Sequence, residues 1–173
     1  MIILKKNEVL SFILTIVAAL LIALFVRNFL FNIAIVNGES MHPTLNEGDK
    51  LICLSYRKFT EIHPGEIVVI DAPNDNRSYI KRVIAKGGDT IEFRDGEVIV
   101  NGEILEENYT STDYTDYENQ DTYTLKENEY FVMGDNRLPG MSVDSRYFGP
   151  IDKKRIKSVA YYRFLPLKDR TKL

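Results

Sequence analysis

Apolar residues run without interruption near the start of the chain and then give way to short alternating runs. Residues 9–26 contain no charged side chain and are rich in Leu, Ile, Ala, Val and Phe. As a helix this run would be roughly 27 Å long, close to the hydrocarbon thickness of a bilayer. It is longer than the apolar region of a cleavable signal, and no small-residue cleavage pattern follows it closely. The run therefore predicts a membrane-spanning helix, with a cleaved signal peptide or a buried core helix as the alternatives.

Beyond this run the pattern predicts strands. Short segments rich in β-branched and aromatic residues occur at 51–56, 66–70, 78–85, 91–94, 97–100, 129–133 and 158–164. Asp95-Gly96 separates two of them and suits the positive φ angles of a two-residue type I′ hairpin turn. We expect a mostly β fold, an antiparallel β-sheet domain preceded by one N-terminal transmembrane helix.

Charged residues before the apolar run predict a membrane topology, and the overall charge makes nucleic acid an unexpected partner. Lys5 and Lys6 precede the apolar run and favour a cytoplasmic N-terminus. Residues 1–31 would then form the cytoplasmic end and anchor, and residues 32–173 an extracytoplasmic domain. With 22 basic against 25 acidic residues and no block of Lys or Arg, nucleic acid is not an expected partner.

The few metal-ligating residues are scattered. The chain has one cysteine and two histidines, and none belongs to a cluster with metal-ligand spacing. We expect no metal and no other cofactor. Residues 103–121 hold seven acids and no Lys or Arg, which predicts an exposed excursion that buries little. The sequence does not indicate an oligomeric state.

Two candidate catalytic side chains lie in the β region. Ser40 lies between Gly38 and Pro43, where backbone N–H groups, its own first, could meet an oxyanion. Strand alternation places Lys81 and Arg82 on opposite mixed faces, so one of these cations should be partly buried. Desolvation can lower a lysine pKa enough for the amine to take the Ser40 proton. Taken singly, however, such a serine is more often a turn residue and such a lysine more often reaches solvent.

A third segment is dense in short polar residues. Gly-Asp-Asn-Arg at 134–137 is followed by Ser-x-Asp-Ser-Arg at 142–146, and Asp144 could pair with a nearby arginine. Together with Gly-x-Ser-Met-x-Pro-Thr-Leu around Ser40 and Tyr-Ile-Lys-Arg-Val-Ile around Lys81, this order of segments resembles the type I (leader) signal peptidases of bacteria. The single span and short chain resemble their Gram-positive branch, and the resemblance covers about residues 9–164.

The resemblance implies a membrane-bound serine endopeptidase that cleaves signal peptides from secretory preproteins after small residues, in Ala-x-Ala-like sequences. Secretory preproteins and the lipid bilayer would be its partners. It implies Ser40 as nucleophile, Lys81 as general base and Ser142 as the residue that holds the lysine. Gly38 stands where one branch of the family has a hydroxyl donor to the oxyanion, so a backbone donor or water would replace it. The remaining implied residues form a supporting network near the site: Met41, Arg82, Asp135, Asp144 and Arg146.

Two alternatives to this interpretation, and one departure from the family pattern, stay open at the level of sequence. Self-cleaving repressors use a Ser-Lys pair on a related β fold, although an N-terminal span in place of a DNA-binding domain argues against them. An inactive membrane-tethered β domain that binds peptides or lipids would leave Ser40 and Lys81 with a structural role only. The family usually has two residues before the serine of the last motif, whereas Leu138-Pro139-Gly140-Met141 makes four and implies a small loop insertion.

Overall fold

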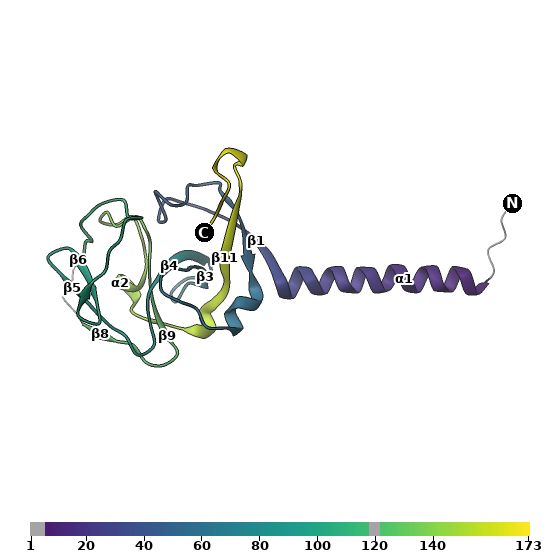
Figure 1. Cartoon of the computed structure of the whole chain (residues 1–173), viewed down its shortest axis with the longest axis horizontal. Helices are drawn as coiled ribbons and strands as arrows, with labels where there is room; N and C mark the ends of the chain where they lie inside the picture. Colours follow the sequence, from purple (N-terminus) through teal and green to yellow (C-terminus); the bar gives the residue numbers. More distant parts are fainter. Residues whose placement is uncertain (1–5, 118–121) are drawn as a thin grey trace.

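The computed structural model describes residues 6–117 and 122–173, and shows a β-rich domain from which one long helix projects (Figure 1). Helix α1 (Lys6–Phe25) continues into a π-helical turn (Val26–Leu30) that leads directly into the first strand. Within it, Glu8–Phe25 has a mean hydropathy of 2.6 and none of its residues is buried, so length and composition allow it to cross a membrane. The helix predicted over 9–26 is confirmed, and its exposure excludes a core helix. Lys5 lies outside the described residues.

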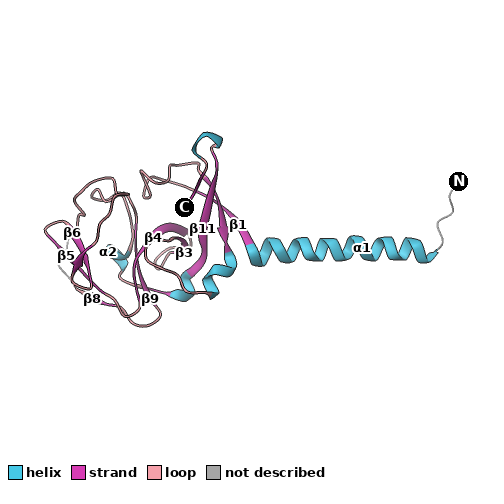
Figure 2. Cartoon of the chain, in the orientation of Figure 1, coloured by secondary structure: helices cyan, strands magenta, loops and turns pink. Residues whose placement is uncertain are grey.

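The strands form two antiparallel sheets, drawn in magenta in Figure 2. The larger follows the order β1-β2-β11-β3-β4-β9-β10, with β12 added to β11. Its strands are β1 (Phe31–Ile35), β2 (Lys50–Leu54), β3 (Ile67–Asp71), β4 (Ser78–Lys86), β9 (Glu129–Met133), β10 (Ile151–Asp152), β11 (Ile156–Leu165) and β12 (Thr171–Lys172). The smaller has the order β7-β6-β5-β8, with β5 (Thr90–Arg94), β6 (Glu97–Val100), β7 (Glu103–Ile104) and β8 (Tyr123–Thr124). A short helix α2 (Ser145–Phe148) and 3₁₀ turns at Ser55–Phe59, Lys153–Arg155 and Leu167–Asp169 complete the described elements.

All seven predicted strands are present, with ends shifted by a residue or two. The predicted hairpin is formed by β5 and β6, and Asp95 and Gly96 have φ angles of 53° and 84°, as a type I′ turn requires. Strand β1 was not predicted, because its apolar residues follow the anchor with no turn signal between. The short strands β7, β8, β10 and β12 were also missed, since two residues carry no readable period.

Strand β4 lies inside the large sheet and has buried residues on both faces. Val83 belongs to one apolar cluster, Ile84 and Ala85 to a second, and Ile80 packs against a third. A register shift against β9 falls between Val83 and Ala85. Since apolar clusters on both sides exclude water from this strand, Lys81 within it is only 3% exposed.

The acidic stretch at 103–121 forms the predicted exposed excursion only in part. In its described residues six side chains are exposed, but Thr115 is buried, Tyr117 stacks on Phe93 with ring centroids 4.1 Å apart, and Glu107 pairs with the buried Arg137. The prediction did not include these contacts because tyrosines supply apolar area to a segment of polar composition, and because an acid opposite a buried arginine neutralises it. Residues 118–121 lie outside the described part.

Candidate active site

Ser40 lies on the long connection between β1 and β2. Two backbone hydrogen bonds close this connection at its ends: the Val36 amide donates to the Asp49 carbonyl over 2.9 Å, and the Gly48 amide donates to the Val36 carbonyl over 2.9 Å. Gly38 has a φ of +84°, a conformation that favours glycine, and it turns the chain into the Ser40 segment. Met41, predicted to pack beside the nucleophile, is 1% exposed and belongs to a buried apolar cluster. The connection is thus pinned on both sides of a half-buried Ser40.

Lys81 reaches Ser40 from β4. Its Nζ donates a hydrogen bond of 2.7 Å to Ser40 Oγ and lies 5.5 Å from the centre of the Tyr79 ring. Burial lowers the pKa of Lys81 from an ordinary 10.5 to about 8; Asp144 and Asp135 oppose the shift and Arg146 assists it. The buried cation predicted for this strand is therefore Lys81, and the amine is poised to exchange a proton with the serine hydroxyl near neutral pH.

A small cavity of about 70 Å³ adjoins the pair. It is lined by Ile35, Val36, Asn37, Ser40, Met41, Ser78, Tyr79, Ile80 and Lys81. A larger groove of about 560 Å³ runs beside it and shares with it Ile35, Asn37 and residues 78–80. An extended peptide could therefore lie in the groove along β1, beside the Ser40 hydroxyl, with one small side chain in the cavity.

Asp144 is a buried hydrogen-bond acceptor for Arg146 and for the Gly134 backbone. Its carboxylate is fully buried and accepts hydrogen bonds from Arg146 Nε (2.9 Å), Arg146 Nη2 (2.8 Å) and the Gly134 amide (2.9 Å). Burial acts to raise the pKa of Asp144, but the Arg146 hydrogen bonds and charge lower it overall. The predicted pairing of Asp144 with a nearby arginine is confirmed.

Ser142 contacts Asp144 rather than the lysine. Its Oγ donates to Asp144 Oδ2 over 2.7 Å, whereas the hydrogen bond of the Lys81 amine goes to Ser40. Among the described residues no hydrogen bond joins Ser142 to Lys81, so the expected direct hold on the lysine is not formed in this structure. The single proton of the Ser142 hydroxyl is used in its bond to the buried Asp144 carboxylate.

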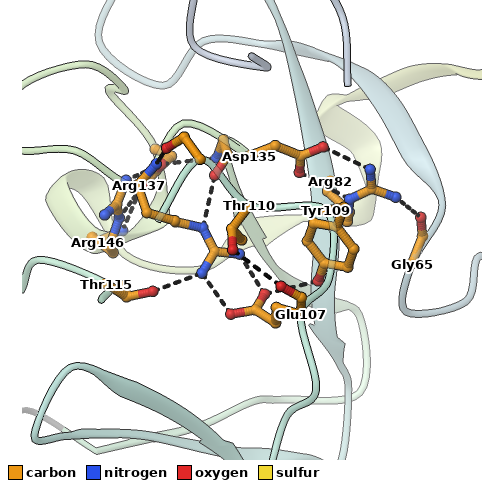
Figure 3. Close-up of polar contacts among 12 residues, drawn as sticks. Gly65, Arg82, Glu107, Tyr109, Thr110, Thr115, Asp135, Arg137 and Arg146 are labelled. Atoms are coloured by element: carbon orange, nitrogen blue, oxygen red, sulfur yellow. Dashed lines mark hydrogen bonds and ion pairs between the residues drawn. The ribbon is translucent and has the colours of Figure 1, made fainter. Parts of the chain in front are cut away.

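Arg82 and Asp135 form a separate ion pair. Arg82 Nε and Nη2 donate to the two oxygens of Asp135 over 2.9 and 2.6 Å, and Tyr109 lies over the guanidinium at 4.0 Å (Figure 3). The predicted network thus contains two arginine-carboxylate pairs, Arg82–Asp135 and Arg146–Asp144. Each acid is paired with an arginine, and in the part of the chain that the structure describes no carboxylate forms an ion pair with Lys81.

Sequence reasoning missed the residues that support this arrangement. Asn136 donates to the Glu39 and Ser40 carbonyls, and Arg137 is fully buried. The sequence did carry one signal. The stretch 103–121 holds seven acids and no cation, and the motif at 134–137 contains an arginine, which needs a counterion when it is buried.

A model of the family described as signal peptidase, peptidase S26, matches residues 9–165. The chain belongs to this family. Signal peptidase I of Bacillus licheniformis is 36% identical, with 95% of this chain and 93% of that protein covered. Signal peptidase I S of Bacillus subtilis is 34% identical over 97% of this chain and 95% of that protein. A crystal structure of a signal peptidase I from Enterococcus faecalis matches with a TM-score of 0.50 and 30% identity, covering 58% of this chain and 97% of that chain.

Family membership confirms the resemblance drawn from the motifs. The chain is a serine endopeptidase that cleaves signal peptides, with a mostly antiparallel β domain and one N-terminal apolar helix. The helix anchors it to the membrane, and its catalytic domain is extracytoplasmic. The match across the anchor and the whole β domain decides against a self-cleaving repressor.

Replacing Gly134 by alanine should disturb the nucleophile. A Cβ there would lie 2.3 Å from the Ser40 carbonyl oxygen and 2.3 Å from Ser142 Oγ, so the Ser40 backbone must move. We expect Gly134→Ala to lower kcat by about 100-fold, because small displacements of reacting groups have large effects on rate. Gly87→Ala is the matched control, since its Cβ would lie 2.2 Å from the Glu127 carbonyl, in contact with backbone away from Ser40. Equal residual activity per folded molecule in the two variants would contradict this account.

Replacing Lys81 by methionine should stabilise the fold. In the unfolded chain Lys81 keeps its proton up to about pH 10.5, whereas in the folded chain it keeps it only up to about pH 8. Burial of the amine therefore costs folding free energy below about pH 8, and this cost disappears as the pH rises from about 8 to about 10.5. We expect Lys81→Met to raise the free energy of unfolding near pH 7 by up to about 3 kcal/mol, and by less near pH 10. Denaturant unfolding in detergent measures this, with Lys86→Met as a surface control. A loss of stability at neutral pH would contradict the burial argument.

Proposed function

We propose that Ser40 is the nucleophile and Lys81 the general base of this signal peptidase. The observation that carries the proposal is the 2.7 Å hydrogen bond between the Lys81 amine and the Ser40 hydroxyl. Lys81 is almost completely buried, which favours its neutral form. A neutral amine within hydrogen-bonding reach of a hydroxyl is what general-base catalysis requires.

In the proposed reaction, Ser40 Oγ attacks the scissile carbonyl carbon while its proton passes to Lys81 Nζ. The ammonium returns this proton to the nitrogen of the departing mature protein, leaving an acyl-enzyme. Lys81 then takes a proton from water, and the hydroxide attacks the acyl carbon. The bond from this carbon to Ser40 Oγ breaks, the Lys81 ammonium returns the proton to Oγ, and the signal peptide leaves as a carboxylic acid. The backbone N–H of Ser40 is the first oxyanion donor. Gly38 has no hydroxyl to offer, and the space where its side chain would lie is open, so a backbone donor or water completes the site.

Substrate choice follows from the size of the cavity beside Ser40. About 70 Å³ accommodates a methyl group but not a large side chain, and this supports cleavage after small residues. The shared lining of the cavity and the adjoining groove suggests two successive subsites along one extended peptide, consistent with an Ala-x-Ala-like preference. Secretory preproteins carrying such sequences are the proposed partners.

The bilayer is the second proposed partner. Residues 1–31 would comprise a cytoplasmic N-terminus and the anchor, and residues 32–173 the extracytoplasmic catalytic domain. The anchor restricts enzyme and preprotein to the same membrane, which raises their effective concentration without any added contact. No metal, cofactor or nucleic acid takes part in the proposed reaction.

Removing either dyad member should abolish cleavage. We expect Ser40→Ala and Lys81→Met each to reduce kcat by at least about 1000-fold with the fold intact, because nucleophile and base act as one unit. Lys86→Met is the matched control, since Lys86 lies on the same strand but pairs with Glu61 at the surface. Cleavage of a purified preprotein in detergent measures the effect. Full activity of Lys81→Met would refute the assignment of the base.

Activity should increase with pH through the Lys81 titration. Only the neutral amine accepts the serine proton, and the pKa of Lys81 is lowered to about 8. We expect kcat/KM to rise about tenfold per pH unit below this value and to level off above it. A pH series on one peptide substrate tests this, and a profile flat from acid to alkaline pH would rule Lys81 out.

A further inference from the structure

The segment 107–116 contacts the motif at 134–137, and Asn136 of this motif contacts the loop that carries Ser40. We propose that Ser111, supported by Glu107, is a positioning residue that keeps the nucleophile in place through Asn136. This proposal rests on the proposed role of Ser40, and it assigns a task to part of the acidic stretch outside the three motifs.

Asn136 is the direct contact with the nucleophile segment. Its backbone amide donates to the Ser40 carbonyl over 3.0 Å, and its side-chain Nδ2 donates to the Glu39 carbonyl over 3.1 Å. It is only 3% exposed, so water does not readily replace these bonds. Because a carbonyl can only accept, the Asn136 amide group must turn its nitrogen toward Glu39 and its oxygen away.

Ser111 meets the oxygen that Asn136 turns away. Its Oγ donates to Asn136 Oδ1 over 3.1 Å and accepts from the Arg137 amide over 3.0 Å. Its own amide donates to the Asp135 carbonyl over 3.0 Å. One residue therefore contacts three consecutive residues of the motif and opposes rotation of the Asn136 side chain.

Glu107 binds the same motif through a buried charge. Arg137 is fully buried, and its Nη1 donates to Glu107 Oε2 over 2.6 Å and to Thr115 Oγ1 over 2.8 Å, while Nη2 contacts Glu107 Oε1 (Figure 3). Arg137 Nε donates to the Gly134 carbonyl over 2.8 Å. A buried guanidinium is tolerated only with a matching carboxylate, so Glu107 ties the 107–116 segment to the motif on which Asn136 sits.

The same segment touches both ion pairs of the site. Tyr109 covers the Arg82 guanidinium at 4.0 Å, and Arg146 Nη1 donates to the Asp116 carbonyl over 3.0 Å. Each arginine that neutralises an aspartate near Lys81 is therefore contacted from this side. We use the word clamp for the five residues of this segment that contact 134–137 or the two arginines: Glu107, Tyr109, Ser111, Thr115 and Asp116.

The first test removes one hydroxyl. In the full chain in detergent, with a signal-peptide substrate, we expect Ser111→Ala to lower kcat about tenfold with KM changed less than about twofold, because the nucleophile is misplaced but the groove is not. Ser111→Thr keeps the hydroxyl and should recover most of the rate. Thr112→Val is the matched control, since among the residues that the structure describes the Thr112 hydroxyl accepts a hydrogen bond from the Tyr114 amide within the segment and does not bond to 134–137.

The second test removes one charge. Glu107→Gln should lower kcat at least as much as Ser111→Ala, whereas Glu106→Gln, the same change at an exposed neighbour, should leave it unchanged. The melting temperature of every variant is measured. If Glu107→Gln does not fold, the comparison of Ser111→Ala with Thr112→Val decides the test. Wild-type kcat in Ser111→Ala, or equal losses in Ser111→Ala and Thr112→Val, would overturn the clamp. An active Ser40→Ala would instead refute the proposed nucleophile, so the two failures are distinguishable.

Discussion

The hydrogen bond between Lys81 and Ser40 depends on keeping an amine out of water, and much of the surrounding structure serves this requirement. Ammonium is far better solvated in water than in a protein interior, so burial lowers the pKa of Lys81 to about 8. Burial in turn needs a strand covered on both faces, which apolar clusters provide for β4 while β3 and β9 pair with its two edges. The serine must approach from a separate segment, and the pinned connection between β1 and β2 supplies it.

Charges near the lysine would undo this effect if they were unpaired. Asp144 and Asp135 both favour the protonated amine, yet each is bound by an arginine, and Arg146 acts in the opposite direction on the pKa of Lys81. Asp144 also holds Gly134 and Ser142 by hydrogen bonds, and a Cβ added at Gly134 would lie 2.3 Å from the Ser40 carbonyl oxygen. The Arg146–Asp144 pair therefore contributes to both electrostatics and positioning, so loss of Arg146 would alter both the basicity of Lys81 and the geometry around Ser40.

The acidic stretch illustrates how composition misleads when charges are complementary. Seven acids without a cation suggest a solvated excursion when the segment is considered alone. Arg137 places a positive charge in the interior, and the Glu107 carboxylate pairs with it. Burying either charge is favourable only when the other is present. Tyr109 and Tyr117 add ring contacts with Arg82 and Phe93 that no polar composition would indicate.

The sequence by itself determined the apolar anchor, the seven main strands, the Asp95-Gly96 hairpin and the candidates Ser40 and Lys81. Each of these depends on local periodicity, on turn chemistry or on a short motif, which neighbouring residues suffice to define. Tertiary structure alone decided which cation of β4 is buried, that Lys81 meets Ser40 across 41 residues, that Ser142 bonds Asp144, and that Glu107 reaches Arg137. These outcomes depend on burial and on partners distant in the chain, because desolvation and ion pairing are properties of the three-dimensional surroundings of a side chain and not of its neighbours in sequence.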